Sequence, residues 1–363
     1  MQPDPNQTRE GAPAPSRSIL FTRAGGFGPG AYLLFSALTL AAVVLCICVG
    51  SVNIPLRDTL RVVSAALRGD ETPGSMARSI ILSVRIPRVL CVSLVGASLA
   101  LCGAAMQGLL KNPLADGSTM GVSSGAALGA VIAIAFDISI PGLPVSGRTG
   151  MAILFAFGSL LLILLLAYKL DSSLSTNTII LIGIVFSMFV SAISSFIITM
   201  VGEKVRNITF WTMGSLQNSS YMNALIMAVP LLVCGGILLH KAEELNAFSV
   251  GEDNARNIGV DVRRVKLEVL ICISVLIGAC VSLSGSIGFV GLVTPHILRR
   301  ILGPNHRRLL PACAFGGAVF LLLADLACRT LLSPRELPIG IITSFVGAIV
   351  FVFIFYSQRR RTQ

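Results

Sequence analysis

Long apolar segments without a charged side chain, separated by short polar loops, make up most of this 363-residue chain. A membrane-spanning helix needs about 20 apolar residues, and eight of the nine segments are near that length. The nine segments are 31–50, 89–110, 117–136, 151–168, 178–202, 218–239, 269–298, 309–324 and 337–358. This spacing predicts a polytopic, all-α membrane protein.

The segment Val269–Leu298 is 30 residues long, which is too long for one ordinary span. Gly285, Gly288, Gly291 and Pro295 interrupt it, so we expect one full span, a tight turn at the glycines and a short half-helix that returns with Pro295 near its start. The segments then yield ten helices. Broken helices of this kind are typical of transporters.

Composition agrees with an integral membrane protein, since 54% of the residues are hydrophobic, 12% are charged and the mean hydropathy is +0.84. Residues 1–30 are rich in Pro and Gly and predict a disordered cytoplasmic arm rather than a cleaved signal peptide. Residues 31–358 form the expected transmembrane domain, and 359–363 a cytoplasmic basic tail. The remaining loops are too short to hold a soluble domain of roughly 50 residues.

Lysines and arginines orient the helices, because cytoplasmic loops carry an excess of them. If both termini are cytoplasmic, 17 of the 28 basic residues lie inside. The net charge of +11 then reflects topology and attraction to anionic lipid. The outer side nevertheless holds one basic cluster, formed by Arg57, Arg61, Arg68, Arg78, Arg85 and Arg88.

The nine cysteines lie in or beside the apolar segments, where free Cys packs as a small hydrophobe. Cys46 and Cys48 form a CxC pair, which without further Cys or His partners is a weak metal signal. His296 follows Pro295 in the half-helix, where capping or packing is the favoured role. We therefore predict no metal site and no bound cofactor.

The chain cannot hold ATP in a Walker A loop, because none of its five lysines follows a glycine. An ion-driven carrier needs acidic residues within its spans. Asp325 is the clear candidate, but Arg329 lies four residues later, where it can neutralise the carboxylate. The interpretation is a structural pair, with a proton relay as the alternative.

Residues 241–266 form a polar loop that contains NAFSVGEDNARNIGVDV. Ser249 and Glu252 have the spacing of a capping box, and Gly259 can end the helix that follows. Glu252 and Arg256 are spaced for a helical ion pair. A short capped helix outside the membrane suits docking to another protein, although a solvated surface turn would carry the same caps.

Several motifs together resemble the FecCD family, the permease subunits of type II ABC importers for ferric siderophores, haem and vitamin B12. The resemblance runs from about the first helix to the C-terminus, with the motifs in the same order and spacing, and leaves out only the N-terminal arm. The motifs are RIPRVL (85–90), GASLALCGAAMQGLLKNPLADGSTMGVSSGAALGA (96–130), GEDNARNIGV (251–260), GSIGFVGLVTPHILRRILGPNHRRLLP (285–311), ADLACR (324–329) and ELPIGIITSFVGAIVF (336–351).

The resemblance implies ten transmembrane helices, a second permease subunit that is a copy or a paralogue, two cytoplasmic ATPases that bind ATP and Mg²⁺, and an extracytoplasmic substrate-binding protein. It places a gate at the cytoplasmic mouth. The gate residues are Asn112, Leu114, Thr176 and Asn177. Asn-Pro and Ser-Thr-Asn are also ordinary turn formers, which is the alternative interpretation.

The resemblance assigns ATPase coupling to Gly251, Glu252, Ala255, Arg256 and Gly259. The resemblance also implies that the helix over residues 178–202 lines the pathway and faces the second permease. Small residues recur there every four positions, at Ser187, Ser191 and Ser195, so a neighbouring helix can approach closely. The same stripe could instead pack within one subunit.

The resemblance also assigns a role to three outer arginines, Arg85, Arg88 and Arg329. They match family positions that receive acidic side chains of the binding protein, which would explain why basic groups lie on the outer side. Lipid anchoring is the alternative interpretation. For cargo we favour an iron(III)–siderophore chelate, imported across a bacterial cytoplasmic membrane, with haem and cobalamin as alternatives. Three other classes of protein remain as alternatives, in decreasing order of support from the sequence: an ion-coupled carrier or channel, a zinc or manganese permease, and an intramembrane enzyme.

Overall fold

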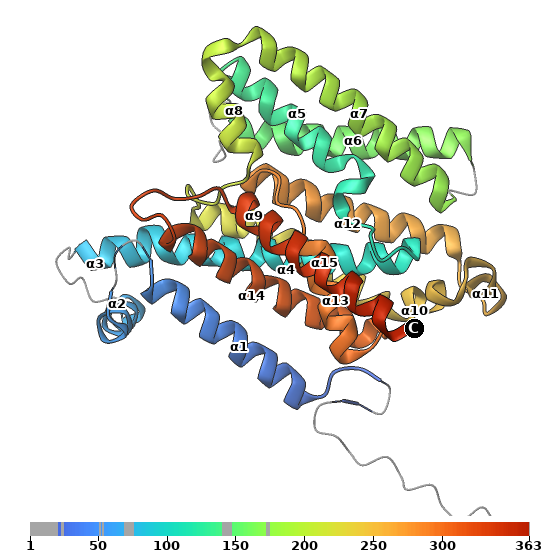
Figure 1. Cartoon of the computed structure of the whole chain (residues 1–363), viewed down its shortest axis with the longest axis horizontal. Helices are drawn as coiled ribbons and strands as arrows, with labels where there is room; N and C mark the ends of the chain where they lie inside the picture. The colour runs from blue at the N-terminus through green and yellow to red at the C-terminus, as the bar shows by residue number, and fades with distance from the viewer. Residues whose placement is uncertain are drawn as a thin grey trace, which may run out of the picture.

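The computed structural model describes residues 21–22, 25–50, 52, 54–68, 76–139, 147–171 and 175–362, so most of the predicted arm lies outside the described residues (Figure 1). The described segments are helices joined by short connections. The α-helices are α1 (Pro29–Cys48), α2 (Leu56–Arg68), α3 (Met76–Ser79), α4 (Ile86–Leu110), α5 (Val122–Ala135), α6 (Gly147–Leu170), α7 (Thr176–Met200), α8 (Val205–Thr212), α9 (Tyr221–His240), α10 (Ala242–Val250), α11 (Glu252–Asn257), α12 (Val262–Ser284), α13 (Val290–Leu302), α14 (His306–Thr330) and α15 (Ile339–Thr362).

The structure confirms the ten predicted helices. Within the described residues, seven helices are long and apolar enough to cross a membrane, with α3 and α4 joined through the π-helix Ile80–Arg85 into one of 35 residues. Two shorter apolar helices, α5 and the Ile339–Phe353 part of α15, correspond to two more predicted segments. The tenth is the half-helix α13.

The break in the longest apolar segment lies where the glycines predict it. Gly285 ends α12 with φ +69°, in a backbone region that side chains with a Cβ rarely adopt. The chain turns through residues 285–289 and α13 begins at Val290, with Pro295 inside its second turn. The prediction of a full span, a turn and a short returning helix is therefore confirmed.

Helix α4 is the central element of the fold (Figure 1). It packs against α14, α13, α12 and α9, and 83% of its apolar stretch is buried, against 17% for α1 at the edge. Glycines permit two close crossings of this helix. A Cβ on Gly103 would collide with the backbone of Gly291 in α13, and a Cβ on Gly96 with that of Gly317 in α14.

Helices α5, α6, α7 and α8 group along one side of this centre, and α1 lies along the opposite side (Figure 1). Two ends of the molecule are distinguished by the elements they carry and are called the loop end and the far end. The loop end carries α10 and α11, together with the end of α4 and the start of α7. The far end carries α8, the start of α9 and the connection between α14 and α15.

Candidate functional site

The loop end presents two short helices outside the apolar spans, α10 and α11, joined at Gly251. Gly251 has φ +143°, which a side chain with a Cβ would disfavour. Helix α11 ends as predicted: Gly259 has φ +91°, and the backbone N–H of Val260 donates to the carbonyl of Ala255 at 3.0 Å. The predicted capping box is wrong, because Ser249 lies in the last turn of α10 and donates to the carbonyl of Asn246 at 2.6 Å.

Glu252, the first residue of α11, joins this helix to two transmembrane helices. Its carboxylate accepts a hydrogen bond from the Thr176 hydroxyl at 3.0 Å, at the start of α7, and from the Lys266 ammonium at 2.7 Å, in α12. The Lys266 side chain is 2% exposed, so its charge is compensated inside the protein. The predicted Glu252–Arg256 pair is therefore wrong, and Lys266 is a functional candidate that sequence spacing did not reveal.

Burial of Glu252 raises the pKa of its carboxyl, but the hydrogen bond and charge of Lys266 outweigh that effect, and the net pKa lies below the ordinary value. The carboxylate thus remains ionised at neutral pH. The predicted coupling residues around it differ in exposure: Ala255 is completely buried in the protein, whereas Arg256 is exposed.

Two large apolar side chains on this loop face solvent, and the sequence motifs do not indicate that either one is exposed. Val250 at the end of α10 is 71% exposed, and Ile258 after α11 is 72% exposed. Both lie outside the apolar spans, so lipid does not account for their exposure. Exposed apolar groups with a charged surround are typical of protein contact sites.

The predicted gate residues lie beside this loop. Leu110, Lys111, Thr176 and Asn177 face residues 251–254 across a hollow of about 580 Å³. Lys111 has φ +50° and begins a turn in which the Asn112 side chain accepts from the backbone N–H of Leu114 at 2.9 Å. The structure thus brings Thr176 and Asn177 of the predicted gate beside residues 251–254, while Asn112 and the exposed Leu114 lie in the adjoining turn.

The serine stripe of α7 faces away from the rest of the subunit. Ser187 is half-buried, and Ser191 and Ser195 are exposed. Large apolar neighbours on the same helix, Phe189 and Phe196, are 63% and 66% exposed. Ser191 and Ser195 therefore do not pack within this subunit, and the stripe is free to meet lipid or a second helix.

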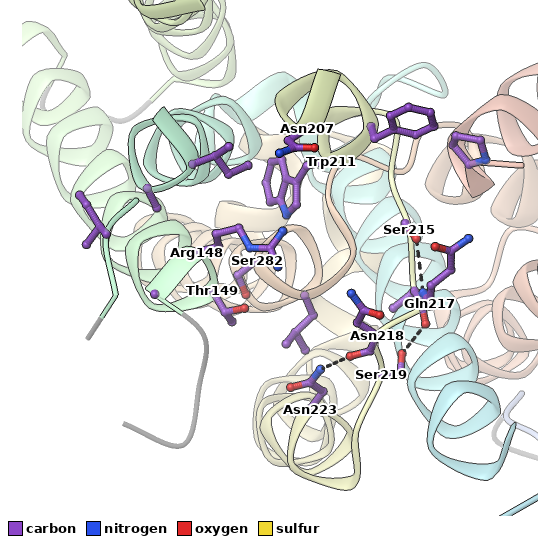
Figure 2. A pocket seen from close by; sticks show the side chains of 18 of the residues that line it. Arg148, Thr149, Asn207, Trp211, Ser215, Gln217, Asn218, Ser219, Asn223 and Ser282 are labelled. Atoms are coloured by element: carbon purple, nitrogen blue, oxygen red, sulfur yellow. Dashed lines mark hydrogen bonds between the residues drawn. The ribbon is translucent and has the colours of Figure 1, made fainter. Parts of the chain in front are cut away.

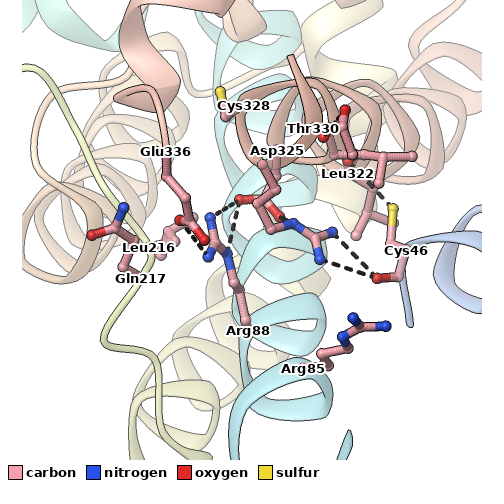
Figure 3. Close-up of polar contacts among 12 residues, drawn as sticks. Cys46, Arg85, Arg88, Leu216, Gln217, Leu322, Asp325, Cys328, Thr330 and Glu336 are labelled. Carbon is pink, nitrogen blue, oxygen red and sulfur yellow. Dashed lines mark hydrogen bonds and ion pairs between the residues drawn. The ribbon is translucent and has the colours of Figure 1, made fainter. Parts of the chain in front are cut away.

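At the far end, the arginines that the resemblance assigns to contacts with the binding protein are buried and form contacts within the chain (Figure 3). Arg85, Arg88 and Arg329 are only 5%, 6% and 4% exposed. Arg88 contacts Asp325 and Glu336, both at 2.8 Å, and Arg329 contacts Asp325 at 2.9 Å, which confirms the predicted structural pair.

The remaining donors of these arginines bind backbone. Arg329 donates to the carbonyl of Cys46 at 3.2 Å, and Arg85 to that of Cys48 at 2.9 Å, both at the end of α1. The cluster thus joins α1, α4 and α14 to the loop before α15. The sequence could not show this, because a buried guanidinium in an ion-pair network and an exposed one have the same local pattern.

A second functional candidate, which we call the outer cavity, has a volume of about 990 Å³ and lies at the far end (Figure 2). Its walls come from α5, α6, α8, α9 and α12 and from the connecting segments around residues 137–139, 204, 215–220 and 336–338, so no single motif marks it. Polar and charged lining residues are Asp137, Ser139, Arg148, Thr149, Lys204, Arg206, Asn207, Ser215, Gln217, Asn218, Ser219, Ser220, Asn223, Ser282 and Glu336.

Comparison with known proteins decides the family. The pattern of the FecCD transport family matches residues 38–357, which is nearly all of the chain after the N-terminal arm. The chain belongs to the FecCD transport family. This agrees with the resemblance drawn from its motifs, and the fold is that of an ABC importer permease.

Three relatives of this FecCD permease are named as permease proteins. It is 40% identical to the ABC transporter permease YvrB of Bacillus subtilis, over 91% of this chain and 94% of that protein. It is 39% identical to the molybdate import permease MolB of Haemophilus influenzae, over 78% and 82%. It is also 39% identical to the cobalamin import permease BtuC of Halobacterium salinarum, over 78% and 75%.

A solved structure of an inward-facing ABC transporter, assigned to the metal-chelate type, superposes on this FecCD permease with a TM-score of 0.79. The two chains are 34% identical, and the match covers 91% of this chain and 99% of the other. The broken helix α12–α13 and the packing around α4 therefore belong to an established permease fold.

Proposed function

We propose that this FecCD permease moves an iron(III)–siderophore type chelate from an extracytoplasmic binding protein to the cytoplasm, powered by ATPases on separate chains. In this proposal it pairs with a second permease, a copy or a paralogue, and two ATPases bind the loop end. The loop end and both termini then face the cytoplasm, and the membrane is the cytoplasmic membrane of a bacterium.

The observation that carries the coupling mechanism is the double contact of Glu252 with Thr176 and Lys266. It fixes helix α11 to the start of α7, where the predicted gate lies, and to the span α12. An ATPase that moves α11 would therefore move the gate without a flexible connection between them. Val250 and Ile258 supply the exposed apolar surface that such a partner would cover.

The contacts of the buried residue Asp325 support ATP as the proposed energy source. Asp325 is 1% exposed and is held by both Arg88 and Arg329. Both of its oxygens contact guanidinium groups, Oδ1 that of Arg88 and Oδ2 that of Arg329, so the carboxylate is part of a structural ion-pair network. This favours external ATP over an ion gradient as the source of work.

The cargo is proposed from the outer cavity and from the comparisons. A cavity of about 990 Å³ with a mainly polar wall can surround a large hydrogen-bonding solute. The solved relative is assigned to the metal-chelate type, while curated relatives carry molybdate and cobalamin. Cobalamin is the second candidate because it is also large and rich in amides, and haem is the third.

The test is transport into vesicles that contain the permease, its ATPase and its binding protein. We expect uptake of a ferric siderophore that requires ATP on the loop-end side and is unchanged by an imposed proton or sodium gradient. Uptake of cobalamin or haem alone would replace the proposed cargo. Uptake driven by a pH gradient without ATP would contradict the proposal and would make Asp325 a candidate relay.

A further inference from the structure

The outer cavity has an excess of positive charge once its ion pairs are counted. Of the two acids that line it, Asp137 pairs with Lys204 and Glu336 pairs with Arg88. Two cationic lining residues remain, Arg148 and Arg206. No carboxylate in the described parts of the chain forms an ion pair with either one.

The two arginines come from different elements and face the same space. Arg148 lies at the start of α6, and Figure 2 shows it directed into the cavity together with Trp211 and Asn207 of α8. Arg206 lies one turn before the Phe210 ring, and its guanidinium stands 5.7 Å from the centre of that ring. This contact restricts the guanidinium without using its hydrogen-bond donors.

Neutral donors surround the two charges. The amides of Asn207, Gln217, Asn218 and Asn223 and several serine hydroxyls line the same cavity. Guanidinium groups bind carboxylates and other planar anions through paired hydrogen bonds, and amides complete the contacts of the remaining oxygens. A neutral ligand could accept hydrogen bonds from the same groups, but only an anion gains the additional attraction of the two positive charges.

We propose that the outer cavity is a binding site for a negatively charged, oxygen-rich chelate, with Arg148 and Arg206 as the residues that select its charge. The inference rests on the proposed import of a chelate and narrows it to anionic forms. The site belongs to the permease itself, so selection by charge occurs after any selection by the binding protein.

The chain carries its own reporter for this site, because Trp211 is its single tryptophan and lines the cavity. The experiment titrates the purified full chain in detergent with two gallium(III) chelates while following Trp211 fluorescence. One probe is a trianionic gallium tricatecholate and the other is a neutral gallium trihydroxamate. Gallium replaces iron because gallium(III) is redox-inert and its chelates lack the ligand-to-metal charge-transfer bands of iron. Absorption by the catecholate itself is corrected with a parallel titration of free tryptophan.

We expect saturable quenching by the trianionic chelate, with an affinity at least about tenfold above that of the neutral one, and weaker binding in high salt. Arg148→Gln and Arg206→Gln should each lower the affinity for the anion by about tenfold, and leave the affinity for the neutral chelate unchanged. The matched control is Arg61→Gln in α2, an exposed arginine outside the cavity, which should change neither affinity.

Equal affinity for the two probes, no saturable change at Trp211, or unchanged binding in both cavity variants would overturn the inference. A folded protein is verified in each variant by its melting temperature and its elution as a single species. The proposed function is tested separately by vesicle uptake. ATP-driven uptake of the trianionic chelate by the Arg148→Gln, Arg206→Gln double variant, at the rate of the parent, would leave import intact and refute charge selection.

Discussion

The carboxylate of Glu252 in α11 lies 2.7 Å from the ammonium of Lys266 in α12, and this contact joins a helix outside the membrane to a transmembrane span. Because Lys266 is almost completely buried, its charge depends on the contacts it makes inside the protein. Breaking a buried pair by removing one partner costs about 3 to 5 kcal/mol, whereas replacing both partners costs less.

Glu252→Gln should therefore destabilise the permease more than the double variant Glu252→Gln, Lys266→Met. Melting temperatures in detergent give the comparison. In reconstituted complexes both variants should hydrolyse ATP with reduced cargo transport per ATP, because the link to Thr176 and α7 is weakened in each. Full transport per ATP in the double variant would show that the contact serves stability alone.

The same link should be insensitive to pH across the neutral range. The pKa of Glu252 in the folded protein lies below the ordinary 4.5. A lowered pKa means that the stabilisation is fully present above the unfolded-state value and is lost as the pH falls through the folded-state value. We expect a loss of stability only below about pH 4.5 that is absent in Glu252→Gln; a Glu252-dependent midpoint above this value would contradict the assignment.

Docking of the ATPase should depend on Ile258 and Val250 rather than on Ala255. Ile258→Glu places a charge on the proposed contact surface and should weaken ATPase binding by about tenfold or more, while the permease stays folded. Copurification and ATPase titration measure the effect. Asn257→Glu, on the neighbouring exposed position, is the control for added charge. Ala255→Leu should instead reduce the yield of folded permease, because Ala255 is completely buried.

Because Arg88 and Arg329 are buried, removing their acidic partner should affect stability, which would not be expected for exposed arginines. Asp325→Ala leaves Arg88 and Arg329 without their shared carboxylate and should destabilise the protein by about 3 to 5 kcal/mol. Arg57→Glu in α2, which is exposed, should change stability by less than about 0.5 kcal/mol. Equal melting temperatures for the two variants would contradict a structural role for the cluster.

The crossing of α4 and α13 provides a test of packing. Gly103→Ala should destabilise the fold by about 1 to 3 kcal/mol or more, because its Cβ meets the rigid backbone of Gly291. Gly236→Ala in α9 has open space around the added carbon and should be neutral or stabilising by up to about 1 kcal/mol. The difference in melting temperature between these two variants measures the cost of the close approach.

The sequence alone determined the fold class, the ten helices and the break at Gly285. Apolar length and glycine position are local properties, and the membrane requires every backbone group of a span to be paired within it. The motifs also placed α11, its end at Gly259 and the Asp325–Arg329 pair. In each case the interacting residues are close in sequence, so spacing carries the information.

Only the tertiary structure decided which charges meet. Glu252 pairs with Lys266 and Thr176 rather than with Arg256, and Arg88 reaches Asp325 and Glu336 from a helix more than 200 positions away in the chain. An arginine near a helix end has the same sequence pattern whether it is exposed or buried. The burial of Arg85, Arg88 and Arg329 and the assembly of the outer cavity follow from the packing of α1, α4, α8 and α14, which no local pattern specifies.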